Sequence, residues 1–166
     1  MRTAVPQTRA EAFALSRAVT LIARAVAEVA AGLAVKWEDA DYIVPPSLID
    51  EGLAKLAVPG GTAPNLWARL LVHPGPANPD GRATLVAGTV GMHAFGLRDI
   101  EYAPSPWPIQ ELLGHASAVA DYLMQPGVVL RDGQTLGTPG QGGFHVRARP
   151  RGLFLSSPIF LLEPAL

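Results

Sequence analysis

Cysteine is absent from the 166 residues, which excludes disulfide bonds and thiolate-ligated metals and favours a reducing, cytoplasmic compartment. Charged side chains are scarce: they make up 16% of the chain, against about 25% in a typical soluble domain. The formal net charge of -1 provides no electrostatic footprint for nucleic acid. No apolar run is long enough to span a bilayer, and residues 1–8 lack the apolar core of a signal peptide. We therefore expect neither a nucleic-acid partner nor a membrane partner.

The N-terminal region predicts one long helix. Thr8 and Glu11 have the spacing of a capping box, so we expect a helix from about Arg9 to Ala31. Its larger apolar residues recur at intervals of three and four and therefore share one stripe: Leu15, Val19, Ile22, Val26, Val29 and Leu33. At a rise of 1.5 Å per residue the stripe is on the order of 30 Å long, whereas typical strands measure about 17–20 Å. A sheet would cover only part of it, so we expect a homodimer in which a second copy covers the remainder.

The remaining pattern predicts an α+β fold with a mainly antiparallel sheet and helices packed on it. A short second helix should follow Ser47, which has the spacing of a cap with Asp50, and a third helix should lie near 108–125. Strands are expected at 34–37, 42–44, 65–73, 84–90, 97–102, 144–149, 153–155 and 159–162. Residues 128–130 and 134–137 flank Asp132-Gly133, which predicts a hairpin. Strands cluster late without βαβ alternation, and the length fits a single domain over 1–166.

The stretch 88–102 carries the densest group of candidate site residues. Strand alternation places Asp99 and Glu101 on one face. One interpretation is a cleft lined by His93, Asp99 and Glu101. We favour the other interpretation, in which the strand reaches the sheet rim and its charges lie in water.

A basic row forms the second candidate site. His145, Arg147 and Arg149 point outward from the strand at 144–149 and could hold a carboxylate or phosphate. We favour a simpler role, in which these charges protect an edge strand from strand addition. His115 lies on the polar side of its helix. The full set of candidate binding residues is His93, Arg98, Asp99, Glu101, His115, His145, Arg147 and Arg149.

No motif assigns catalytic residues. The four histidines lack ligand spacing, so we expect no metal. The glycine-rich run 137–143 lacks the Lys-Ser/Thr of a phosphate loop, and no dinucleotide fingerprint is present, so we expect no cofactor.

Three segments in order resemble the bacterial family called domain of unknown function 4261. They are the stretch 88–102, the helix ending at 120–123, and the run 127–137 with its Asp132-Gly133 turn. The resemblance covers roughly 85–146, with weaker likeness at 35–47. It implies a bacterial, cytoplasmic α+β domain without an established activity. The matching positions are Gly91, Phe95, Gly96, Glu101, Asp132, Gly133 and Gly137, and each could serve the fold or a site.

We therefore expect a non-catalytic binding or interaction module that acts as a homo-oligomer. A special case is an antitoxin or immunity protein that covers the surface of another protein. The alternative is a small hydrolase or ligand-processing enzyme with a cleft near His93 and Glu101. Convergence of His93 or His115 with a carboxylate in a concave pocket would favour the enzyme, whereas an exposed apolar patch would favour binding.

Overall fold

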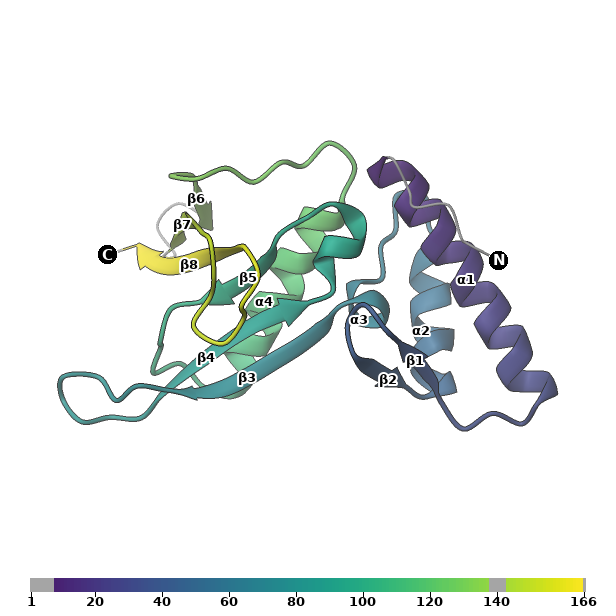
Figure 1. Ribbon diagram of the computed structural model, residues 1–166, viewed down its shortest axis with the longest axis horizontal. Coiled ribbons are helices and arrows are strands. Elements are labelled where there is room, and N and C mark those ends of the chain that lie inside the picture. The colour runs from purple at the N-terminus through teal and green to yellow at the C-terminus, as the bar shows by residue number, and fades with distance from the viewer. Residues whose placement is uncertain (1–7, 138–142, 166) are drawn as a thin grey trace.

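The computed structural model describes residues 8–137 and 143–165 (Figure 1). The expected glycine-rich connection falls largely on 138–142, outside the described residues. The helices are α1 (Arg9–Val29), α2 (Pro46–Leu56), α3 (Pro64–Trp67), the 3₁₀ helix η1 (Met92–Phe95) and α4 (Ile109–Met124). The strands are β1 (Val35–Trp37), β2 (Tyr42–Val44), β3 (Arg69–Gly75), β4 (Thr84–Val90), β5 (Asp99–Tyr102), β6 (Thr135–Gly137), β7 (Gly143–Arg149) and β8 (Ile159–Ala165).

Six strands form the main sheet in the order β3-β4-β5-β8-β7-β6. Every neighbouring pair is antiparallel except β5 and β8, which are parallel with Asp99 opposite Ile159 and Tyr102 opposite Leu162. Strands β1 and β2 form a separate antiparallel hairpin. The α+β class with a mainly antiparallel sheet and a long N-terminal helix is thereby confirmed.

Helix α4 packs on one face of the main sheet, against β3 and β4. Helical spacing puts Ile109, Leu112, Ala116, Val119 and Leu123 on one stripe. The last four lie in the core, whereas Ile109 in the first turn is exposed. The segment 150–158 crosses the opposite face, where Phe154 packs against the His73 ring at 4.8 Å. Figure 1 shows α4 behind the sheet and this yellow segment in front of it. These two layers position the candidate residues of β5 between them.

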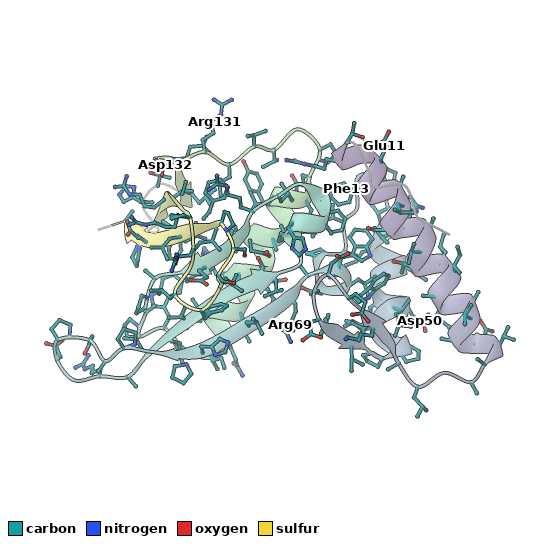
Figure 2. The ribbon with its side chains drawn as sticks, viewed as in Figure 1. Glu11, Phe13, Asp50, Arg69, Arg131 and Asp132 are labelled. Carbon is teal, nitrogen blue, oxygen red and sulfur yellow. The ribbon has the colours of Figure 1, made fainter. Side chains whose placement is uncertain are left out.

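Helix α1 lies at the end of the molecule beside α2 and the β1–β2 hairpin (Figure 1). It contacts α2 and η1, and its small residues Ala12, Thr20 and Ala27 face inward. An ion pair between Arg24 Nε and Asp50 Oδ1, 2.5 Å apart, joins α1 to α2. Phe13 also points inward and stacks on Phe95 at 4.8 Å between ring centroids (Figure 2).

The two ends of α1 differ in how well the sequence specifies them. The capping box is confirmed: Glu11 N donates to Thr8 Oγ1, and Thr8 N donates to a Glu11 carboxylate oxygen. At the C-terminus, Gly32 N donates to Ala27 O at 2.7 Å, which closes the last turn. Ala31 takes the left-handed conformation there, with φ of 49°, where a glycine is the usual residue.

Four expectations about local structure are wrong. One is the strand at 153–155: these residues form no strand and lie in the segment between β7 and β8. The residues at 64–67 form α3 rather than the start of a strand, because Pro64 begins a helical turn. Ser47 does not cap α2, whose N-cap residue is Pro45 without a side-chain hydrogen bond. Residues 128–130 form no strand; after the Asp132-Gly133 turn, β6 pairs with β7 instead.

Within the described ranges, no helix combines the length and the apolarity needed to cross a membrane.

Candidate functional site

Asp99 is a buried carboxylate at the start of β5. Its Oδ1 accepts hydrogen bonds from Thr89 Oγ1 at 3.0 Å and from Met92 N at 3.1 Å. Met92 is the first residue of η1, whose N-cap residue Gly91 has no side chain to offer. Asp99 therefore caps η1 from a neighbouring strand, in place of a local N-cap side chain.

Burial raises the pKa of Asp99 above its ordinary value, because the charged carboxylate loses its hydration. The hydrogen bonds from Met92 and Thr89 and the proximity of His93 act in the opposite direction. His93 Nδ1 lies 3.7 Å from Asp99 Oδ2, and the His93 side chain is 59% exposed. The pair joins an anchored carboxylate to a histidine in contact with solvent.

Glu101 is fully buried at the centre of the sheet. Its carboxylate accepts three consecutive backbone N–H groups, from Leu153 at 2.5 Å, Phe154 at 3.3 Å and Leu155 at 2.9 Å. A Cβ atom at Gly152 would collide with the same carboxylate. Glu101 thus holds the segment 150–158 against the sheet. In return, the backbone N–H groups of this segment surround the Glu101 carboxylate with hydrogen-bond donors.

These positions overturn the interpretation that the β5 charges lie in water at the sheet rim. Both carboxylates are buried and hydrogen-bonded, since the strand lies inside the sheet with β4 and β8 on either side. The sequence held no signal for this, because the partners are backbone N–H groups of η1 and of 153–155.

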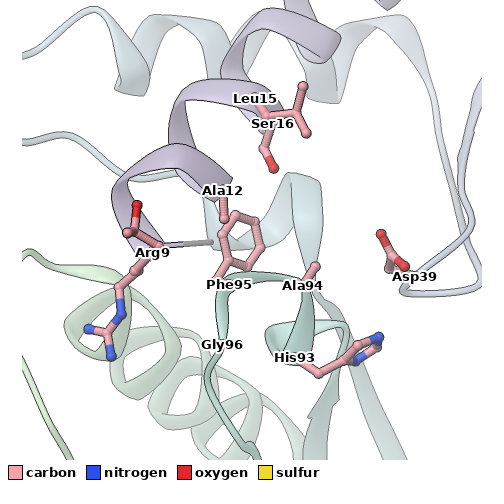
Figure 3. Close-up of a pocket in the computed structure, with 10 residues that line it drawn as sticks. Arg9, Ala12, Leu15, Ser16, Asp39, His93, Ala94, Phe95 and Gly96 are labelled. Carbon is pink, nitrogen blue, oxygen red and sulfur yellow. The ribbon is translucent and has the colours of Figure 1, made fainter. Parts of the chain in front are cut away.

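A hollow of about 400 Å³ lies beside His93, between the start of α1, η1 and the β1–β2 turn. Figure 3 shows His93 and Asp39 on one side of it, Arg9 on the other, and Ser16 above. Glu101 does not line this hollow. The structure therefore brings His93 and Asp99 together but separates them from Glu101.

The polar side chains at this hollow are not arranged as a linked catalytic group. The 3.7 Å separation from Asp99 is longer than a hydrogen bond. Among the described residues, no hydrogen bond joins Ser16 or another hydroxyl to His93. No group of three or more His, Asp or Glu side chains suited to a metal occurs in the ranges that the structure describes.

His115 and Arg98 lie apart from that hollow. The expectation that His115 lies on a polar helix side is wrong, because it is half-buried among aromatic rings. His115 packs against Tyr102, Trp107 and Phe144, with ring centroids 5.1–6.2 Å away, and its Nδ1 lies 3.5 Å from the buried Tyr102 hydroxyl. Burial raises the pKa of Tyr102 above its ordinary value, so the phenol stays protonated. The guanidinium of Arg98 lies over the Phe160 ring at 5.2 Å.

The basic row on β7 is partly neutralised. Arg147 and Arg149 both approach Glu163 on β8, at 3.5 Å and 3.7 Å. His145 Nδ1 lies 3.3 Å from Thr135 Oγ1 on β6. β6 pairs with β7 only at Gly143, Phe144 and His145. The expectation that the row protects an edge strand is therefore wrong at His145 and stays a prediction for Arg147 and Arg149. Whether the row binds an anion stays a prediction.

The most unusual surface is the outward face of α1. The predicted apolar stripe exists, but the chain leaves it largely uncovered: Leu15, Val19, Ile22, Val26 and Val29 are all exposed, as is Leu33 beyond the helix. Leu15 and Val19 border a hollow beside the β1–β2 hairpin. Exposure rises along the stripe from 36% at Leu15 to 90% at Val29. Leu21, which lies outside the predicted stripe, is also exposed. We name Leu15, Val19, Leu21, Ile22, Val26 and Val29 the outer face of α1.

The positions that carry the family resemblance all have structural roles. Gly91 and Gly96 flank η1 with φ of 111° and 67°, and a Cβ at Gly91 would lie 2.8 Å from the Trp67 carbonyl oxygen. Phe95 is in the core. On the other side of the sheet, the Asp132-Gly133 turn is bonded to β7 through Ala148 N and Val146 O; Gly137 ends β6 with φ of 133°.

Comparison with known proteins places a family match on the same part of the chain. Residues 88–158 match the family model described as Domain of unknown function (DUF4261). No curated protein and no solved structure matches the chain. The matched range runs from the end of β4 to the segment that Glu101 holds, and it excludes α1. The resemblance expected from the motifs at 88–102 and 127–137 is confirmed: residues 88–158 of this chain are similar to the domain of unknown function family DUF4261.

Proposed function

We propose that the protein is a non-catalytic interaction module that self-associates as a homodimer through the outer face of α1. The observation that carries the proposal is the exposure of a row of aliphatic side chains on one helix face. Soluble monomers rarely expose contiguous apolar patches above about 600 Å². Six Val, Leu and Ile side chains at these exposures approach that size.

The composition of this face favours a partner that is also apolar. Besides the six aliphatic residues, two further outward positions are alanines, Ala18 and Ala25. Arg24 falls on the other side of the helix, where Asp50 of α2 engages it, whereas Arg17 and Glu28 lie beside Leu21 at the edge of the outer face. A charged or polar partner would find no complementary group on the outer face.

A second copy of the chain fits this surface. A two-fold contact places the same face opposite itself, and the charges that border this face, Arg17 and Glu28, are of opposite sign. The formal net charge of -1 adds little long-range repulsion. Burial of a Val, Leu or Ile side chain contributes about 1.5–3 kcal/mol, so several of them can offset the entropy lost on association.

The geometry of the candidate site supports the non-catalytic part of the proposal. Asp99 and Glu101, the carboxylates that an enzyme would need, are engaged in holding η1 and the segment 150–158. His93 shares its hollow with Asp39 and Ser16, but among the described residues no hydrogen bond joins His93 to either of them, so no nucleophile is activated there. The absence of cysteine supports a cytoplasmic setting for the module, and its similarity to DUF4261 supports a bacterial one.

Light scattering on the full chain at micromolar concentration tests the proposal. We expect the mass of two chains, and we expect Val26→Glu to yield monomers because it would bury an unpaired charge. Val58→Glu is the matched control: Val58 is 61% exposed and Val26 is 60% exposed, but Val58 lies beyond the end of α2. A wild-type mass of one chain, or equal masses for the two variants, would contradict the proposal.

A further inference from the structure

We propose that the groove beneath the first turns of α1 binds a carboxylic acid with an unbranched alkyl chain. The groove has a volume of about 740 Å³ and runs between α1, the end of α2 and the end of α4. Its volume lies within the range of about 300–1,000 Å³ that is typical of small-molecule sites. This proposal goes beyond the interaction function, because it concerns the opposite side of α1.

The floor of the groove is apolar. Leu56, Trp67 and Met124 are buried and line it, together with the inward-facing ring of Phe13. The indole Nε1 of Trp67 donates to Thr20 Oγ1 at 3.0 Å, so its one polar atom is already engaged. A ligand resting on this floor meets carbon atoms and aromatic faces, which suits an alkyl chain.

The rim of the groove is positively charged. Arg9, Phe13 and Arg17 follow one another at intervals of four residues, which places both guanidinium groups beside the aromatic floor. Arg9 Nη1 donates to Val128 O at 2.7 Å. For Arg17, the structure gives no hydrogen bond or ion pair with any residue in 8–137 or 143–165. No described residue that lines the groove is acidic.

This arrangement selects the head group of the ligand. A guanidinium without a protein partner binds a carboxylate through two parallel N–H···O bonds. Arg17 therefore takes the carboxylate, and the alkyl chain lies along Phe13 toward Trp67 and Met124. A cationic amphiphile with the same chain would meet like charge at the rim.

The first experiment compares two ligands on the unmodified full chain. Tryptophan fluorescence is followed during titration with decanoate and with decyltrimethylammonium, each below its micelle-forming concentration. We expect saturable binding of decanoate and at least tenfold weaker binding of the cation. Trp67→Phe should remove the fluorescence change, because Trp67 lines the groove. Equal affinity for the two ligands, or no saturable binding of decanoate, would overturn the proposal.

The second experiment assigns the head-group contact. We expect Arg17→Gln to weaken decanoate binding about tenfold, as loss of a charge-assisted hydrogen bond does. Arg82→Gln is the control, since Arg82 is exposed and does not line the groove, and it should leave the affinity unchanged. An unchanged affinity in Arg17→Gln would overturn the assignment. Binding should persist in Val26→Glu, so this test is independent of the dimer.

Discussion

Apolar side chains are usually buried and charged ones exposed, but helix α1 departs from the first rule and strand β5 from the second. The outer face of α1 puts aliphatic side chains in water, whereas β5 puts Asp99 and Glu101 inside the protein. The buried carboxylates find donors in η1 and in 153–155. The aliphatic face finds no cover in the described part of the chain. Buried carboxylates that find hydrogen-bond donors within the fold have a structural explanation. Exposed aliphatic side chains that nothing in the fold covers point to a partner outside the chain.

Helix α4 is the internal reference for this comparison. Its stripe has the same helical spacing as that of α1, yet Leu112 is fully buried while Val26 in the stripe of α1 is 60% exposed. Periodicity identifies which residues share a face, but the element that covers the face depends on the topology.

The largest expected effect comes from removing the buried charge of β5. Glu101→Leu leaves the N–H groups of 153–155 without their acceptor. Each unpaired buried donor costs about 1–3 kcal/mol, so we expect a loss of about 3 kcal/mol or more in the free energy of unfolding, measured by urea titration. Glu51→Leu, at an exposed position of α2, is the control. Equal midpoints for the two variants would contradict the anchoring role of Glu101.

The next effect contrasts the two helices directly. Leu112→Ala in α4 should lower the free energy of unfolding by about 3 kcal/mol, because it opens a cavity in the core. Leu21→Ala on the outer face of α1 should change it by less than about 0.5 kcal/mol in dilute, monomeric protein. If α1 pairs with a second copy, the cost of Leu21→Ala should grow with protein concentration. A large cost for Leu21→Ala in dilute protein would show that its chain already covers this face.

A smaller effect concerns the helix caps. Thr8→Ala removes the capping box of α1 and should cost about 1 kcal/mol. Ser47→Ala should have almost no effect, because Ser47 forms no cap on α2. Thermal unfolding of the two variants measures the difference in stability. A melting temperature unchanged by Thr8→Ala would contradict a stabilising role for the capping box of α1.

The smallest expected effect is a dependence on pH at Asp99. Because burial raises the pKa of Asp99, the folded state holds this proton at a pH where the unfolded state, with a pKa of about 3.9, has released it. Stability contributed by the protonated form is thus present below the unfolded pKa and is lost as the pH rises through the folded pKa. Relative to Asp99→Asn, the wild type should lose stability over this rise, as urea midpoints at successive pH values would show. If the difference in urea midpoint between the wild type and Asp99→Asn is the same at every pH, the raised pKa of Asp99 is contradicted.

The sequence predicted the regular parts of the fold well. The spacing of apolar and capping residues along the chain predicts the span and cap of α1, the stripe of α4 and the alternation at 144–149. The prediction from the sequence failed where the local structure depends on an element that is distant in the chain. Residues 134–137 pair with β7 rather than with 128–130, and Pro64 starts a helical turn ahead of β3.

The candidate site was harder to predict for the same reason. Asp99 and Glu101 were identified as residues of interest, but their burial depends on β8 pairing with β5. The groove under α1 was missed altogether, because Phe13 and Trp67 are 54 positions apart and converge only through the packing of α1 on the body of the protein. The spacing of Arg9, Phe13 and Arg17 is the one signal that the sequence offered.

The placement of β8 has a consequence for how the chain folds. This last strand inserts between β5 and β7, in the interior of the main sheet. Strand β5 keeps an unpaired edge until residues 159–165 have left the ribosome, and the nascent sheet is open to intermolecular pairing during that interval. The parallel contact of β5 with β8 also closes a long loop of chain, which slows folding. Synthesis rate and chaperone capacity should therefore limit the yield of folded protein more than its final stability does.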